Sequence, residues 1–207
     1  MMSRSVARWV SAVLVVGLAI PATSCLRRQY PVKKQYVVDV SRPGAAMVPE
    51  GKAILSIARV RTEPQYDRKS FVYRTGEYRY ADDFYNTFYV PPSTLIRVTM
   101  FDWISASGVF AYVIAPESLV QREYTLESRL QSFYIDRRPE VEPGAVVAFT
   151  VTLVNSSSAR GKVLFEKSYE EREPITGKNE SAYVTAWAAA LARALAKVEL
   201  DLAAAVR

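Results

Sequence analysis

The stretch AVVAFTVTLV, residues 145–154, decides the fold that we expect for this chain. It is mostly apolar and rich in β-branched residues, which is typical of a central strand. Segments 123–135 and 163–169 flank it, and in both of them apolar and polar residues alternate with the period of a half-buried strand. The loop NSSSARG, 155–161, joins the last two strands. Because the three strands follow one another directly, we expect an antiparallel meander.

Shorter segments with strand composition lie before the meander, at 34–40, 53–60 and 109–114. Between them, FVYR (71–74) and EYRY (77–80) flank Thr75 and Gly76, which predicts a tight hairpin with a glycine able to take a positive φ. Residues 82–89 follow as an aromatic-rich connector.

A helix is expected over 94–106. Two prolines, Pro91 and Pro92, restrict the entry of the chain, and Ser93 is the expected N-cap. Gly108 is the expected C-terminal cap. One face of this helix is apolar, and Val98 and Phe101 widen it; the residues of the face are Ile96, Met100, Trp103 and Ile104.

A longer helix is expected over 179–205, because apolar residues recur there at steps of three and four. They are Tyr183, Trp187, Leu191, Leu195, Val198 and Leu202. The alanines between them permit close packing on a sheet, although an amphipathic helix for a membrane surface or a partner is the alternative. We therefore expect an α+β fold, with a mainly antiparallel sheet and two helices packed on one face. Residues 35–207 are expected to form a single domain.

The first 24 residues have the pattern of a secretory signal peptide. Arg4 and Arg8 precede an apolar run over 9–20, and small residues then lead to Cys25. The run is too short to span a bilayer, which needs about 20 residues. We expect cleavage between Ser24 and Cys25, and residues 25–34 as a linker.

Cys25 is the one cysteine of the chain, so it cannot close an internal disulfide. The sequence ATSC, 22–25, resembles a bacterial lipobox, in which the cysteine is lipidated and becomes the first mature residue. Ala22 stands where leucine is usual, and an ordinary signal peptide with a chance cysteine is the alternative. In bacterial lipoproteins an aspartate directly after the cysteine commonly retains the protein in the inner membrane. Residue 26 is a leucine here, so the same resemblance implies sorting to the outer membrane. A covalent lipid on Cys25 is then the attachment, and no other cofactor is expected.

Several kinds of function are not favoured by the composition. A net charge of +6 without a dense basic stripe argues against nucleic-acid binding. The absence of histidine removes the commonest general base and metal ligand. The adjacent acids Asp82 and Asp83, and likewise Glu170 and Glu171, would point to opposite faces of a strand, and we interpret them as solvated charges. We therefore expect that the chain has no catalytic residue and no metal site, and that the protein is not an enzyme.

The order of these segments resembles the ABC-type transport auxiliary lipoproteins, including the paraquat-inducible protein C type. The resemblance rests on the cysteine, on YVV (36–38), on FVYR (71–74), and on the connector and the alanine-rich closing helix. In the connector, Phe88 and Tyr89 stand in place of an Arg-Trp pair, and Pro91 in place of a glutamate. Phe88, Tyr89 and Pro91 are therefore the candidate partner-binding residues.

This resemblance implies an outer-membrane lipoprotein on the periplasmic side that accompanies an ABC transporter and its MCE-domain protein in lipid transport. Its role would be to dock the periplasmic conduit to the outer membrane, and a homo-oligomer is left open. The alternative is a lipid- or glycan-binding periplasmic lipoprotein that works alone, or an envelope-assembly cofactor.

Overall fold

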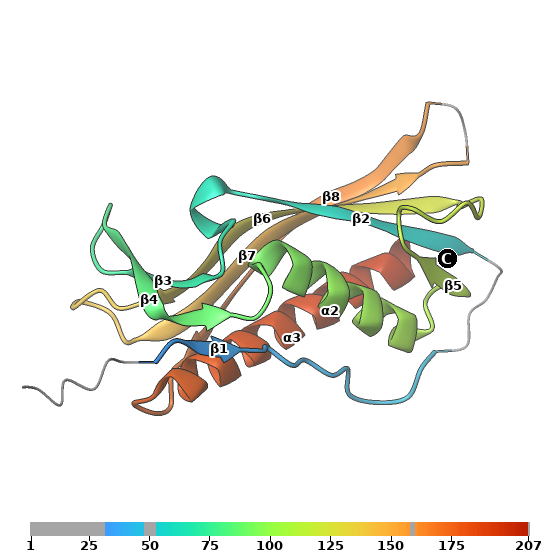
Figure 1. Cartoon of the computed structure of the whole chain (residues 1–207). Helices are drawn as coiled ribbons and strands as arrows, with labels where there is room; N and C mark the ends of the chain where they lie inside the picture. The colour runs from blue at the N-terminus through green and yellow to red at the C-terminus, as the bar shows by residue number, and fades with distance from the viewer. Residues whose placement is uncertain (1–31, 48–52, 158–159, 207) are drawn as a thin grey trace, which may run out of the picture. The chain divides into compact units, whose positions relative to one another are not determined.

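A computed structural model describes residues 32–47, 53–157 and 160–206 (Figure 1). The predicted signal peptide, the cleavage site at Ser24 and Cys25, and most of the predicted linker lie outside the described residues. Lys33–Arg207 forms one compact unit. The fold below is that of this unit.

Eight strands of the described chain form one sheet. Their bounds are β1 (Lys34–Tyr36), β2 (Ile54–Thr62), β3 (Ser70–Arg74), β4 (Tyr80–Phe88), β5 (Tyr112–Ile114), β6 (Tyr124–Asp136), β7 (Gly144–Asn155) and β8 (Lys162–Pro174), and a short 3-10 helix, η2 (Pro64–Tyr66), joins β2 to β3. Strands β6, β7 and β8 pair antiparallel along almost their whole length. The predicted meander is therefore confirmed, and β7 is its central strand.

The rest of the sheet corrects our prediction of a mainly antiparallel arrangement. The free edge of β6 is shared by two strands, β2 along its first half and β3 at its end, and both pair with it in parallel. Two more pairs are parallel, β2 with β5 and β1 with β4, while β3 and β4 form the antiparallel hairpin. The prediction failed because the chain leaves β2 through the hairpin and a helix before it returns as β6. A crossover of this kind brings a strand back in the same direction.

Two α-helices of the described chain, α2 (Pro92–Ser107) and α3 (Glu180–Ala205), cover the same face of the sheet (Figure 1). Helix α2 lies against β2, and α3 lies against β7 and β8. This confirms the predicted α+β class with two helices on one face. All six apolar residues predicted for the face of α3 are buried. Because the apolar face of α3 packs on the sheet, it is not available to a membrane surface, and the alternative of a membrane-surface helix is not supported.

An aromatic cluster forms the centre of the core between the sheet and α3. The indole of Trp187 is fully buried and stacks on Phe133, with ring centroids 5.2 Å apart and planes 5° apart. Phe71 and Phe88 pack edge-on against the same indole at 4.9 and 5.0 Å. These large, offset aromatic contacts stabilise the attachment of α3 to the sheet.

Three of the four helix ends lie close to where the sequence predicts them: the start of α3, its end at Ala205 and the end of α2. Asn179 caps α3, because its side-chain oxygen accepts a hydrogen bond from the Ala182 N–H at 3.1 Å. Gly108 ends α2 in the left-handed region at φ 72°. Ser93 is not the N-cap of α2: the helix begins at Pro92, Pro91 takes the cap position, and no side chain caps it. Proline tolerates the first helical turn because its missing N–H would have no intrahelical partner there.

Three predictions near the hairpin also need correction. The first strand ends at Tyr36, and residues 37–40 continue without strand pairing, because its partner β4 ends at Phe88. The expected connector 82–89 belongs almost entirely to β4. The turn between β3 and β4 spans residues 75–79, and Gly76 does not take a positive φ.

Candidate docking surface

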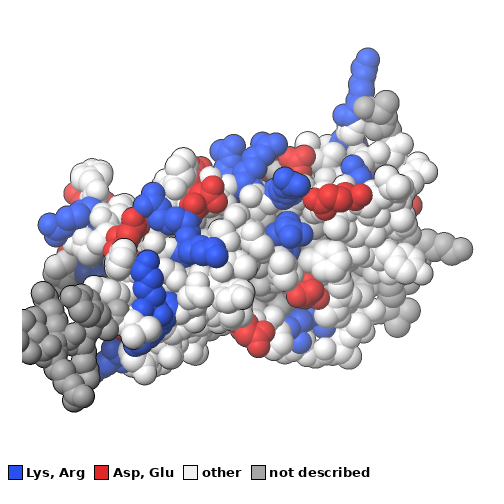
Figure 2. Space-filling model, viewed as in Figure 1, with Lys and Arg blue, Asp and Glu red and all other residues white. Residues whose placement is uncertain are grey.

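An apolar groove of about 230 Å³ lies between the chain after β1 and the first turns of α2. Three large side chains on it are exposed to an unusual degree: Val37 by 68%, Tyr89 by 61% and Val98 by 45%. Exposed apolar side chains that gather in one place mark interaction sites more often than scattered ones do. The lining residues are Tyr36, Val37, Val38, Tyr89, Val90, Thr94, Leu95, Val98 and Thr99. In Figure 2 the surface over α2 is mostly uncharged.

One wall of the groove is an extended segment, residues 37–47, which we call the strap. It begins where β1 ends, and the Tyr89 N–H donates a hydrogen bond to the Tyr36 carbonyl at 2.8 Å. Val38 is buried, and at the other end the Met47 N–H donates to the Ser107 carbonyl at 2.7 Å. The strap therefore lies along α2 from its first turns to its last residue.

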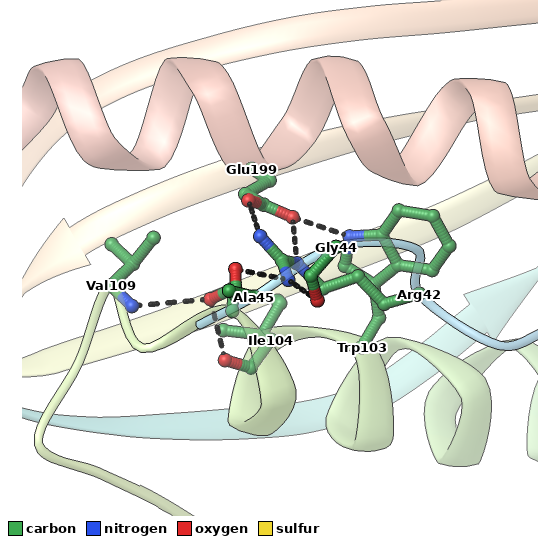
Figure 3. A network of polar contacts seen from close by, with 8 residues as sticks. Arg42, Gly44, Ala45, Trp103, Ile104, Val109 and Glu199 are labelled. Carbon is green, nitrogen blue, oxygen red and sulfur yellow. Dashed lines mark hydrogen bonds and ion pairs between the residues drawn. The ribbon is translucent and has the colours of Figure 1, made fainter. Parts of the chain in front are cut away.

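An ion pair holds the middle of the strap against both helices (Figure 3). Two guanidinium nitrogens of Arg42 donate to the two carboxylate oxygens of Glu199 on α3, each at 2.8 Å. The indole N–H of Trp103 on α2 donates to the same carboxylate at 2.8 Å. Arg42 also donates to the carbonyls of Gly44 and Ala45, at 3.2 and 3.0 Å. The pair therefore joins three segments that are far apart in the sequence.

Water has little access to this ion pair, since only 10% of the Arg42 side chain and 12% of the Glu199 side chain are exposed. The hydrogen bonds from Arg42, helped by the one from Trp103, hold the pKa of the Glu199 carboxyl below its ordinary value. A bidentate pair of this kind fixes geometry as well as charge. The strap is thus held as a rigid wall of the groove.

The structure separates the three candidate partner-binding residues. Tyr89 lies on the groove with its ring exposed, and Pro91 is half-buried at the start of α2 beside it. Phe88 is 1% exposed and packs into the aromatic core, so its side chain offers no surface for a partner. Cys25 and Ser24 lie outside the described residues. Partner contact by Tyr89 and Pro91 stays a prediction.

Sequence reasoning missed the other half of the groove. The sequence predicts Val98 on a widened buried face of α2, yet its side chain is exposed on the groove. The sequence predicts Val37 inside a strand, yet it belongs to the strap. An apolar residue off the main helical face was the signal for Val98. For the Arg42–Glu199 pair the sequence holds no signal, because the two residues are 157 positions apart.

The adjacent acidic residues point to opposite faces of their strands, as predicted. Asp82 pairs with Arg68 at the surface, whereas Asp83 accepts a hydrogen bond from the Tyr73 hydroxyl at 2.7 Å. Glu170 is exposed, whereas Glu171 is buried and pairs with Arg193 at 3.0 Å and with Lys197. The interpretation as solvated charges is therefore wrong for Asp83 and Glu171, which tie structural elements together.

Two features are absent from the residues that the structure describes. These residues contain no group of three side chains of the kind that could hold a metal ion. Neither α2 nor α3 carries an apolar stretch that could cross a bilayer.

The fold and the groove define a class of protein: an α+β domain, with two helices on one face of a mixed sheet, that presents an apolar surface suited to docking. Residues 36–199 match the family model described as the ABC-type transport auxiliary lipoprotein component. The chain belongs to this family.

Solved structures share the fold. The protein XCC0632 from Xanthomonas campestris is similar with a TM-score of 0.74 at 16% identity, over 83% of this chain and 95% of that one. The hypothetical protein CT253 from Chlamydia trachomatis is similar with a TM-score of 0.56 at 8% identity, over 75% and 98% of the two chains. At these identities the likeness shows the fold alone. Comparison with curated proteins finds no match.

Proposed function

We propose that this protein is a non-catalytic lipoprotein of the outer membrane that docks the periplasmic conduit of an ABC and MCE-type lipid transport system. In this proposal the chain is cleaved between Ser24 and Cys25, and a lipid on Cys25 anchors it on the periplasmic side. The family match over residues 36–199 is the observation that carries the proposal. It covers the whole groove and both helices down to Glu199.

The groove is the proposed contact for the MCE-domain protein. Its volume of about 230 Å³ is below the roughly 300–1,000 Å³ of pockets that enclose small ligands. It therefore suits one or two apolar side chains of a protein partner better than a whole lipid. Tyr89 supplies a large contact area at low cost in side-chain entropy, which is why tyrosine is enriched at protein interfaces.

The groove also lies close to the anchor along the chain. Tyr36 lies eleven positions after Cys25, and an extended chain spans at most about 3.6 Å per position. A partner held at the groove is therefore within about 40 Å of the lipid. This limit fits a docking role at the membrane surface.

Site-specific crosslinking in cells tests the groove. A photoreactive amino acid in place of Tyr89 is expected to yield an adduct with an MCE-domain protein. Tyr112 is a matched control, because it is 67% exposed on β5 and lies off the groove. Equal adducts from both positions, or a second copy of this chain captured at Tyr89 in place of the MCE protein, would contradict the proposal.

Cys25→Ser tests the anchor. The variant is expected to leave the membrane fraction while its domain stays folded, because Lys33–Arg207 is compact by itself. Membrane fractionation and circular dichroism measure the two effects. Retention of the variant in the outer membrane would overturn the lipid attachment. Lipid that co-purifies with a soluble 26–207 fragment would favour the alternative of a lipoprotein that binds lipid alone.

A further inference from the structure

The sheet face opposite the helices carries a hollow of about 660 Å³, formed by β2, β6, β7 and β8. Its floor consists of short side chains, Ala58, Thr150, Thr152 and Ser168, and longer side chains rise around them. The β2 bulge after Ile57 places Ala58 in this floor. We call this feature the charged hollow. Figure 2 shows basic and acidic side chains intermixed along the upper part of the view, where Figure 1 labels β2 and β8.

The charged hollow lies on the face away from the helices, as the alternation of β6 shows. Leu126, Ser128 and Leu130 are buried, and the Ser128 hydroxyl contacts the Met100 sulfur of α2 at 3.6 Å. The residues between them, Glu127 and Arg129, are exposed and therefore point to the opposite face.

Strand register sorts the charges of the hollow by sign. Arg61 on β2 is paired in register with Arg129 on β6, and the row continues through Thr150 to Ser168. Two residues back along β6, a second row begins at Glu127. It crosses Thr152 on β7 and ends at Glu166 on β8. Apart from Arg59 in the β2 bulge, which pairs with Glu117, one row is therefore basic and its neighbour is acidic, with hydroxyl groups in both.

These four charges have no ion-pair partner among the described residues. Arg61 and Arg129 make no side-chain hydrogen bond there either, and Glu166 accepts one from the Thr152 hydroxyl at 3.1 Å. Like charges directly opposite on neighbouring strands are destabilising. The register of Arg61 with Arg129 therefore costs stability unless an anion lies between the two guanidinium groups.

The floor between the rows is held in place by its own hydrogen bonds. The Thr150 hydroxyl contacts both the Gln131 amide oxygen at 2.9 Å and the Ser168 hydroxyl at 2.8 Å. A site whose floor is ordered before binding loses less entropy when a ligand enters.

We propose that the charged hollow binds a zwitterion that carries a phosphate diester and a primary ammonium, the chemistry of a phosphoethanolamine headgroup. The phosphate would lie on Arg61 and Arg129, because guanidinium groups bind phosphate with two parallel hydrogen bonds. The ammonium would face Glu127 and Glu166. Two residues along a strand span about 6.6 Å, which is a separation that a headgroup of this size can bridge.

The charge balance of the hollow favours a zwitterion over a simple ion. Arg59 also lines the hollow, but its charge is balanced by its ion pair with Glu117 at 3.3 Å. The remaining two guanidinium groups and two carboxylates sum to zero, so a ligand of zero net charge leaves none of them uncompensated. A plain anion would meet the acidic row, and a plain cation would meet the basic row. The volume of about 660 Å³ is within the usual range for a small-ligand site.

Binding of glycerophosphoethanolamine to the full chain, purified in a maltoside detergent, tests the proposal by calorimetry. We expect saturable binding with one ligand per chain. The pair R61Q/R129Q and the pair E127Q/E166Q are each expected to weaken binding at least tenfold. The exposed Arg160, in the loop between β7 and β8, offers the matched control R160Q, which is expected to bind like the parent.

Three further measurements complete the test. Inorganic phosphate is expected to bind at least tenfold more weakly than glycerophosphoethanolamine. Vesicles that contain phosphatidylethanolamine, used in place of the soluble diester, show whether the chain also binds the headgroup of the intact lipid. Thermal unfolding is expected to show R61Q/R129Q folded and no less stable than the parent, because a like-charge pair is removed. Absence of saturable binding, equal binding of phosphate, or parent-like binding by E127Q/E166Q would overturn the proposal.

Discussion

Arg42 and Glu199 show how a single contact shapes a surface. This ion pair holds the strap against both helices. The residues next to Arg42 and Glu199 in the sequence give no indication that the two side chains pair. Because both side chains are largely withdrawn from water, removal of one leaves the other charge uncompensated, which costs far more than loss of a surface ion pair.

We therefore expect Arg42→Ala to lower the free energy of unfolding by about 2–4 kcal/mol. Arg59 is a matched control: its pair with Glu117 is exposed by 85% and 63% at the two side chains. Arg59→Ala is expected to change the free energy by less than about 0.5 kcal/mol. Denaturant titrations with unchanged slope measure both values. Equal effects of the two variants would contradict the structural role of Arg42.

Carboxylates that are paired with arginine and have a lowered pKa also determine how the stability of the fold depends on pH. Hydrogen bonds from Arg42 hold the pKa of Glu199 below its ordinary value of 4.5, and a hydrogen bond from Arg138 holds the pKa of Asp136 below 3.8. A lowered pKa in the folded state means stability that is present above the ordinary value and is lost as the pH falls through the folded value. The chain has no histidine that would titrate near neutrality.

The free energy of unfolding is thus expected to be nearly constant between about pH 6 and pH 8 and to fall below about pH 4.5. Glu199→Gln should be less stable near neutrality and should show a smaller loss in acid, because one of the titrating groups is gone. Urea titrations over this pH range measure the difference. Parallel curves for parent and variant would show that Glu199 does not contribute.

At the scale of elements, the end of α2 and the strap are fitted together. Gly108 takes a positive φ, and a Cβ built on it would overlap the Met47 carbonyl oxygen at the end of the strap. Gly44, within the strap, also has a positive φ, but a Cβ there would meet no atom within 4 Å. A substitution at Gly44 therefore introduces backbone strain alone, whereas one at Gly108 introduces backbone strain and steric overlap with Met47.

Gly108→Ala is expected to displace the end of the strap, in addition to about 1–2 kcal/mol of strain from the left-handed conformation. Gly44→Ala is expected to show the strain alone. Hydrogen exchange of residues 37–47 is the measurement, with faster exchange at Met47 expected in Gly108→Ala but not in Gly44→Ala. If hydrogen exchange at Met47 is the same in both variants, the close contact between the strap and the end of α2 does not hold the strap in place.

At the scale of the whole molecule, the compact unit begins just before β1. A fragment of residues 33–207 is expected to unfold in one cooperative transition like that of the full chain. A fragment of residues 48–207 lacks β1, Arg42 and the wall of the groove, and it is expected to be less stable than Arg42→Ala. Thermal unfolding of the two fragments checks this. A stable 48–207 fragment would show that the strap is dispensable for the fold.

The local patterns of the sequence determined much of this fold. Period-two alternation located β6 and β8, a continuous apolar and β-branched run located β7, and apolar residues at steps of three and four located both helices and the buried face of α3. These signals survive in the structure because each depends on residues that are neighbours in the chain. The family resemblance, which the family model confirms, rested on the order of the same segments.

The tertiary structure alone decided the rest. Parallel pairing of β2 and β3 with β6 depends on the path of the chain between them, and local composition carries no information on that path. Phe88 and Tyr89 are adjacent aromatics, yet Phe88 ends β4 with its side chain in the core, whereas Tyr89 follows the strand and lies exposed on the groove. The strap, held by Arg42, and the charged hollow, with Arg61 beside Arg129, both arise from contacts between distant residues. Such contacts exist only once the sheet has formed, which is why no local pattern could reveal them.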